Sequence, residues 1–351
     1  MMHYGLLLLG EHPPERLLTL TRFAEEHDFE HLWYADEKFY RDPYVSLAHL
    51  AGHTSRIRLG ICVTDPYTRH PALTAMAMAT LAELAGGRGV LGIGAGSSGL
   101  QAMGLKQTKL PTALREAIEL IRQLWAGGTV TYQGETVAFH GGELNFKPPP
   151  DIPILVATSG RQILRLAGEL ADGVMLGDMA SARVIIPALG EVRRGAERAG
   201  RSLAGVPLIA RANLIISNDP AEARKLMRPW IAIGLWYTYP KWDYYFNYTP
   251  EWDERLRPIK EFIERQGGKP RNVGDFNLIA AYTDLIDDDM VYDAALAGTV
   301  DDVVKQIVEI AGTGITQITL YPMPLVGQTT ESVLHEFVQQ VMPRVEDILK
   351  R

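Results

Sequence analysis

Short apolar runs alternate with amphipathic segments along most of the chain. Runs of this kind, with few polar interruptions, predict strands that are buried on both faces, as in parallel sheets. Eight of them occur, at residues 3–10, 31–36, 57–64, 89–96, 152–159, 173–178, 206–216 and 315–322. Eight is the number of strands that a closed parallel barrel requires, so the pattern predicts an α/β fold, a (β/α)8 TIM barrel.

Two segments between and after these runs have clear helical spacing. In residues 112–128 the apolar positions recur every three or four residues, and Gly127 is a stop signal. Residues 330–342 repeat the pattern after a Thr or Ser cap and would form the eighth helix. We expect both apolar stripes to pack on the barrel wall.

Two insertions interrupt the alternation, one after helix 4 and one after strand 7. Residues 129–146 alternate with period two around Gly134, which predicts a β-hairpin. Residues 230–256 gather several tryptophans and tyrosines, which predicts an aromatic substrate mouth or subunit contact, or equally an insertion that packs on itself. No composition shift divides the chain, so residues 1–351 are expected to form one domain.

Charge and composition narrow the possible functions. A formal net charge of −7 argues against nucleic-acid binding, which needs clustered Lys and Arg. The chain has no uninterrupted run of about 18 apolar residues, so no membrane span is predicted. The single cysteine, Cys62, excludes internal disulfides and fits a cytoplasmic protein, and its strand position favours packing over nucleophilic chemistry.

Two glycine-containing motifs follow predicted strands. The segment GAGSSG at 94–99 matches a dinucleotide fingerprint, but no helix opens after it, so it indicates only a close backbone approach, to a ligand or at a crowded barrel rim. In ATSGR at 157–161, the hydroxyls of Thr158 and Ser159, the turn at Gly160 and Arg161 at a helix start form a candidate phosphate cradle. A plain helix cap by Ser159 explains the second motif equally well.

Charged residues also follow the second strand. Asp36 and Glu37 lie where the catalytic rim of a barrel is expected. Alternation along a strand predicts that at most one of them faces the cavity, while the other pairs with Arg41 or Arg69. The pair His49 and His53 has zinc-like spacing without the accompanying Glu, so we expect solvent-facing histidines and no metal site.

Taken in order, these rim segments resemble the luciferase-like superfamily of flavin and deazaflavin enzymes. They look most like the coenzyme F420-dependent branch typified by methylenetetrahydromethanopterin reductase. The matching pieces cover nearly the whole chain outside the two insertions, at residues 35–37, 60–84, 86–96, 114–124, 157–174 and 298–322.

The resemblance implies an oxidoreductase that moves hydride between F420 and a small organic substrate, and a homo-oligomer, either a dimer or a tetramer. It also implies a bulge with a non-proline cis peptide at Cys62–Val63 that supports the cofactor ring. The resemblance also implies two sets of cofactor contacts. The phosphate set is Thr158, Ser159, Gly160 and Arg161. The ring or side-chain set is Asp36, Thr64, Gly94, Ala95, Gly96 and Ser97.

Two departures separate this chain from the activities known in that branch. Leu7 stands where the reductase carries a proton-transferring Glu, and Glu37 stands where the glucose 6-phosphate enzyme has a His. Glu37 with His12 is therefore the expected proton carrier, beside Asp36 in the catalytic set, although a structural salt bridge explains Glu37 nearly as well. An FMN-dependent monooxygenase and a non-catalytic flavin-binding barrel remain alternatives.

Overall fold

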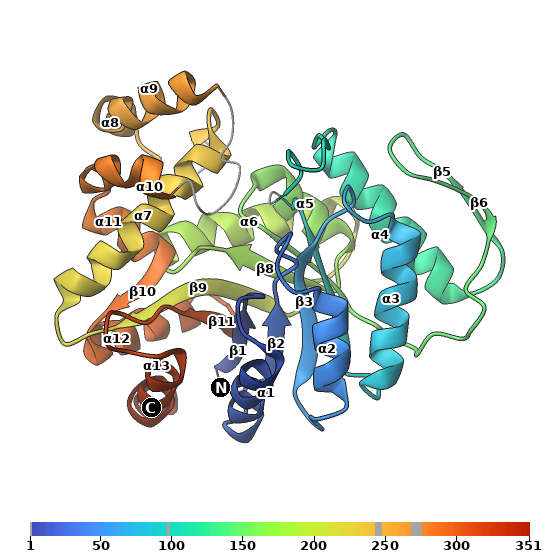
Figure 1. Ribbon diagram of the computed structural model, residues 1–351, viewed down its shortest axis with the longest axis horizontal. Coiled ribbons are helices and arrows are strands. Elements are labelled where there is room, and N and C mark those ends of the chain that lie inside the picture. The colour runs from blue at the N-terminus through green and yellow to red at the C-terminus, as the bar shows by residue number, and fades with distance from the viewer. Residues whose placement is uncertain (1, 97–98, 243–247, 268–275) are drawn as a thin grey trace.

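A closed barrel of parallel strands forms the centre of the molecule, with helices around it (Figure 1). The computed structural model describes residues 2–96, 99–242, 248–267 and 276–351. Within these residues, no helix is both long and apolar enough to cross a lipid bilayer.

The barrel strands all coincide with predicted runs. They are β1 (His3–Leu8), β2 (His31–Tyr34), β3 (Arg58–Thr64), β4 (Gly89–Gly94), β7 (Ile154–Thr158), β8 (Gly173–Gly177), β9 (Leu208–Ile216) and β11 (Gln317–Pro322). They pair in this order, β11 pairs with β1, and the predicted TIM barrel is confirmed. A further strand, β10 (Ala295–Gly298), extends the edge of β9 and was not predicted.

Helices cover the outer surface of the barrel. They are α1 (Pro14–Glu26), α2 (Pro43–Ala51), α3 (Pro71–Leu84), α4 (Leu110–Ala126), α5 (Arg161–Leu170), α6 (Ala182–Arg198), α12 (Val300–Ala311), α13 (Thr330–Glu336) and α14 (Met342–Leu349). The predicted stop at Gly127 is the C-cap of α4. The predicted eighth helix is longer than expected, because a π-helical turn (Phe337–Val341) joins α13 to α14.

Trp33 fills much of one layer of the barrel interior. Its indole is fully buried, and the neighbouring strands leave room for it at Gly5 and Gly60. A Cβ atom on Gly60 would lie only 2.3 Å from the indole ring. Large and small residues therefore alternate around this layer, as close packing of a barrel requires.

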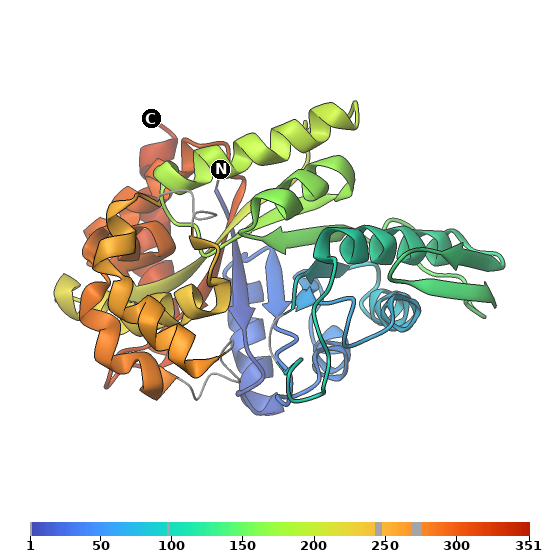
Figure 2. The ribbon, with the colours of Figure 1, turned by 90° about the horizontal axis from the view of Figure 1, so that it is seen from above.

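The two insertions project from opposite ends of the molecule (Figure 2). The predicted hairpin is confirmed as β5 (Val130–Gln133) and β6 (Ala138–Gly142), and the buried Glu116 of α4 accepts hydrogen bonds from its turn. The second insertion is helical and packs on the carboxyl ends of β9, β10 and β11. It contains α7 (Pro220–Thr238), α8 (Glu251–Arg255), α9 (Arg257–Gln266), α10 (Phe276–Ile279), a 3-10 helix (Ala280–Leu285) and α11 (Asp288–Ala294).

The aromatic residues of the helical insertion mostly serve its own core. Trp236, Trp242 and Trp252 are buried among its helices, so the interpretation of a self-packed insertion holds for them. Trp230 differs, because its ring meets the edge of Tyr321 at the end of β11, with 6.4 Å between ring centres. Trp230 therefore links the insertion to the barrel interior.

His31 lies buried at the amino end of β2 as a neutral base. Its ring stacks on Trp33, and its Nδ1 accepts from the amide of Gln317 at 2.9 Å. Burial, with smaller contributions from Arg58 and His3, lowers the pKa of His31 from 6.5 to about 3. Between about pH 3 and pH 6.5, His31 is therefore neutral in the folded protein but protonated in the unfolded chain.

This difference predicts a stability that falls as the pH drops below 6.5. Between pH 7.5 and pH 5.0, His31 alone should remove about 2 kcal/mol of unfolding free energy. Urea denaturation of His31→Gln should show a pH dependence weaker by that amount. His49→Gln, at an exposed position on α2, is the matched control and should keep the wild-type dependence. Equal slopes for wild type and His31→Gln would contradict the assignment.

Candidate active site

The carboxyl ends of the strands form the mouth of the barrel, where TIM-barrel active sites lie. Most of the residues predicted for the site follow β2, β3, β4 or β7 at this end. Four apolar side chains of the interior are only partly buried here and form its floor: Leu9, Cys62, Ala157 and Tyr321.

Lys38 sits between two carboxylates at the rim. Its Nζ lies 2.8 Å from Asp36 and 3.2 Å from Asp65, and the three side chains are only 12%, 11% and 1% exposed. Asp65 also accepts from the backbone N–H groups of Tyr67 and Thr68, both at 2.8 Å. We call Asp36, Lys38 and Asp65 the rim cluster; it ties the loop after β2 to the loop after β3.

The rim glycines make room for this cluster. A Cβ atom on Gly96 would lie 2.4 Å from Asp65, and one on Gly99 would lie 2.5 Å from Lys38. The crowded-rim interpretation of the glycine motif therefore has a structural basis. Gly94 is buried, whereas Ala95 and Gly96 keep some exposed surface. Ser97, predicted as a cofactor contact, lies outside the described residues.

Asp36 and Glu37 line one small cleft of about 190 Å³ together with Lys38. Because β2 ends at Tyr34, strand alternation does not decide which of the two carboxylates faces the barrel cavity, and that expectation stays a prediction. Asp36 pairs with Lys38.

Arg41 and Arg69 make several contacts at the rim. Arg41 donates to the backbone carbonyl groups of Gly10 and Glu11, which joins the loops after β1 and β2. Arg69 pairs with Asp42 and lies over the ring of Tyr44, 4.5 Å from its centre.

His12 lies in the loop after β1 and is almost completely buried. Its Nε2 is 3.4 Å from a carboxylate oxygen of Glu11. Burial lowers the pKa of His12, against the attraction of Glu11. Arg16, Arg41 and Glu331 also affect the pKa of His12. His12 therefore lies on the side of the rim next to α1.

The third strand carries the bulge that the resemblance implied. The peptide between Cys62 and Val63 is cis, and the pairing of β3 with β4 shifts between Ile61 and Thr64. Cys62 and Val63 are half-buried at the mouth. Thr64, the last residue of β3, is fully buried, and its place near the cofactor stays a prediction.

The Cys62 thiol has the environment of a packing residue. Its sulfur lies 3.4 Å from the sulfur of Met175, and burial raises the pKa of the thiol to about 12, against a lowering effect of Arg211. A thiol with this pKa stays protonated at neutral pH and is a poor nucleophile.

The start of α5 faces the same mouth and lacks a side-chain cap. The N-cap residue is Gly160, so the alternative that Ser159 simply caps the helix is wrong. Thr158 Oγ1 accepts from the N–H of Gly160 at 3.0 Å, and Ser159 is exposed. Arg161 lies 3.8 Å from Glu191 of α6, which also binds Arg165 and Arg194 closely. An uncapped helix start with hydroxyls and a guanidinium suits an anion.

Sequence reasoning missed one residue at the mouth, Arg211, and the pairing of another, Lys38. Arg211 of β9 forms an ion pair with Asp178 after β8, and its guanidinium lies 5.6 Å from the ring centre of Tyr321. The signal was available, since Arg211 is a charged residue inside an otherwise apolar predicted strand. Lys38 follows the second strand with Asp36 and Glu37, but nothing in the sequence indicated its pairing, because a lysine in a loop is ordinarily solvated.

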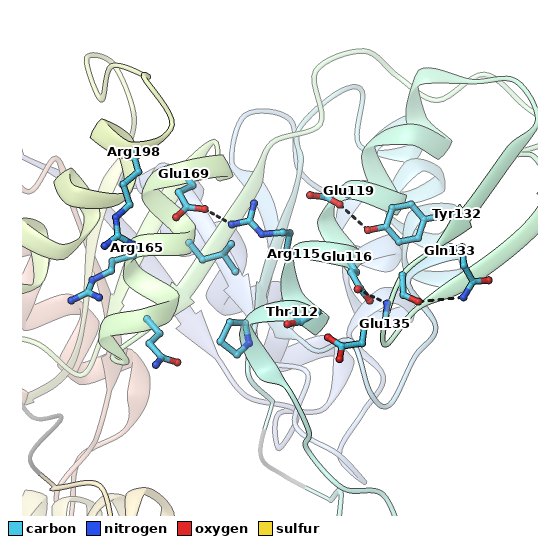
Figure 3. A pocket seen from close by; sticks show the side chains of 14 residues that line it. Thr112, Arg115, Glu116, Glu119, Tyr132, Gln133, Glu135, Arg165, Glu169 and Arg198 are labelled. Carbon is cyan, nitrogen blue, oxygen red and sulfur yellow. Dashed lines mark hydrogen bonds and ion pairs between the residues drawn. The ribbon is translucent and has the colours of Figure 1, made fainter.

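A larger cleft of about 680 Å³ lies elsewhere, between α4, α5 and the hairpin (Figure 3). Its charged side chains largely satisfy one another. Arg115 pairs with Glu169, the Tyr132 hydroxyl donates to Glu119 at 2.7 Å, and Glu116 binds the hairpin turn. Although this cleft is larger, the barrel mouth is therefore the stronger candidate for the active site.

The structure is thus a closed parallel barrel with a bulged third strand and an uncapped helix start at its mouth. The chain belongs to the luciferase-like monooxygenase family, whose model matches residues 2–317.

Known relatives agree with this membership. The chain is 32% identical to the 5,10-methylenetetrahydromethanopterin reductase of Archaeoglobus fulgidus, over 90% of this chain and 92% of that protein. It is 33% identical to the F420-dependent glucose-6-phosphate dehydrogenase of Kineococcus radiotolerans, over 63% and 70%. The structure of the coenzyme F420-dependent tetrahydromethanopterin reductase from Methanopyrus kandleri matches with a TM-score of 0.79 and 29% identity, over 98% of this chain and 99% of that one.

The rim cluster leads to a stability prediction. Lys38→Met would leave two buried carboxylates without their cation, so we expect a loss of about 3 to 5 kcal/mol in unfolding free energy. Lys109→Met is the control, because Lys109 pairs with Glu135 on the surface and should matter by less than about 1 kcal/mol. Urea denaturation measures both. Equal small effects would show that the rim cluster does not organise the mouth.

Proposed function

We propose that the protein is a coenzyme F420-dependent oxidoreductase that transfers hydride between the deazaflavin and a small organic substrate. The observation that carries the proposal is the uncapped start of α5 with Arg161, beside a half-exposed apolar floor at the mouth. Relatives named as F420-dependent enzymes, two of which cover most of the chain, support the choice of cofactor.

The residues at the mouth fit such a cofactor by their chemistry. The first-turn N–H groups of α5, the hydroxyls of Thr158 and Ser159, and Arg161 would hold its phosphate. Cys62, Val63 and Ala157 would support a flat apolar ring. Asp36, Ala95 and Gly96 at the rim would meet its edge. When bound, F420 supplies a carbon centre that gives or accepts a hydride.

Glu37 is the group that we assign to proton transfer. It lines the small rim cleft, and it adds slightly to the effect of burial, which raises the pKa of Tyr321 at the mouth. His12, in the loop after β1, is the second candidate, because its ring lies 3.4 Å from the Glu11 carboxylate, with which it would exchange a proton. Both belong to loops at the catalytic rim.

The substrate side is assigned to the loops after β1 and β2 and to Trp230. Trp230 is the tryptophan of the insertion that contacts the interior, through Tyr321. Leu7 stands where the reductase carries a proton-transferring Glu, and Glu37 stands where the glucose 6-phosphate enzyme has a His. We therefore do not assign the substrate of either enzyme to this chain.

The protein is also proposed to form a homo-oligomer. Large apolar side chains are exposed on α2 and α3, which pack side by side (Figure 1): Val45, Leu73, Met76 and Leu84. Such a patch is typical of a subunit contact. Light scattering should give a multiple of 38.9 kDa, and Leu73→Glu combined with Met76→Glu should lower that multiple. A wild-type monomer at micromolar concentration would reject this part of the proposal.

Cofactor choice is tested by titrating the purified protein with F420 and with FMN, followed by fluorescence. We expect F420 to bind and FMN to bind far more weakly. Arg161→Ala should weaken F420 binding by about 10- to 150-fold, because a charge-assisted contact to phosphate contributes about 1.5 to 3 kcal/mol.

Arg194→Ala is the matched control for Arg161→Ala. It removes another arginine from Glu191 but leaves the start of α5 intact, so F420 affinity should not change. Tight FMN binding without F420 binding would favour the monooxygenase alternative. Cofactor binding without hydride transfer to any acceptor would favour the non-catalytic alternative.

A further inference from the structure

Arg211 places a guanidinium inside the mouth of the barrel. Ile209, two residues earlier on β9, belongs to the interior cluster, so alternation directs Arg211 to the same interior, one layer nearer the mouth. Its register partners are Gly177 on β8 and Thr319 on β11. The side chain is 18% exposed and therefore reaches solvent at the mouth.

This guanidinium is buried beside groups that carry no charge at neutral pH, Cys62 and Tyr321. Burial lowers the pKa of Arg211, and these two groups raise it by smaller amounts, which indicates a cation that is incompletely solvated. Asp178 is its one carboxylate partner in the described part of the chain. A guanidinium has five N–H donors, and a single carboxylate engages at most two of them well.

Asp178 is a partner that is able to leave. It is the first residue after β8, and its side chain is 58% exposed, so it can turn into solvent without becoming a buried charge. Arg211 cannot follow it, because β9 holds its backbone between β8 and β11. The pair thus combines a fixed cation with a displaceable anion.

We propose that Arg211 recognises an oxyanion on the substrate, a carboxylate or a phosphate, which takes the place held by Asp178. This inference rests on the proposed function, since the substrate must enter the same mouth as the cofactor. The cofactor's own phosphate is assigned to α5, which follows β7, whereas Arg211 lies two strands further around the barrel on β9. The two anion positions are therefore separate.

The test uses the F420-loaded protein, so that the phosphate position at α5 is filled. Inorganic phosphate and succinate are titrated separately by calorimetry into wild type, Asp178→Asn, Arg211→Met and Arg211→Lys. Asp178→Asn should bind at least one of the two anions about tenfold more tightly, because the internal competitor loses its charge. Arg211→Met should lose this binding, and Arg211→Lys should retain part of it.

Arg183→Met is the matched control. Arg183 lies on α6 and pairs with Asp293 of α11 at 2.9 Å, so its replacement should leave anion binding unchanged. A preference for phosphate or for succinate identifies the source of the oxyanion, and either supports the proposal. Unchanged anion affinity in both Asp178→Asn and Arg211→Met would overturn it and return Arg211 to a clamp between β8 and β9.

F420 affinity, measured first on each variant, separates this inference from the proposed function. We expect it to vary by less than about threefold among these variants, since none alters the start of α5. Absence of F420 binding in the wild type would reject the proposed function itself. A selective loss of F420 binding in Arg211→Met would assign the guanidinium to the cofactor and overturn the substrate assignment.

Discussion

The ion pairs of Lys38 with Asp36 and Asp65 are the constraint on which the mouth depends. A cation this poorly exposed is stable only between carboxylates, and these two come from loops that follow different strands. Gly96 and Gly99, after β4, are needed to admit the same side chains. One charge cluster therefore fixes the relative positions of three loops, and with them the surface that a ligand meets.

The rim cluster also holds the end of the third strand, next to its bulge. Asp65 directly follows β3 and anchors its loop through the N–H groups of Tyr67 and Thr68. Because the end of the strand is held in this way, the register shift between Ile61 and Thr64 stays local. The consequence is that Cys62 and Val63 keep a fixed position on the mouth floor.

The sequence was a good guide to features that depend on near neighbours along the chain. Buried strands and the α4 stop at Gly127 follow from local pattern, and all eight barrel strands were found. The strand β10 was missed because its sequence, ALAG, consists mainly of small residues with low strand propensity. The partner of Asp36 was missed because β2 ends before it, so only the folded loops decide whether Lys38, Arg41 or Arg69 reaches it.

Local charge, more than net charge, decides what the mouth can bind. The chain carries −7 overall, yet charges more than about 10 Å apart are largely screened in physiological salt. Lys38 is neutralised by its two carboxylates, whereas Arg161 and Arg211 stand on separate elements and at different depths. If both proposals hold, an acidic protein would bind anions at two positions in one mouth, and the distance between these arginines would set the orientation of a ligand that bridges them.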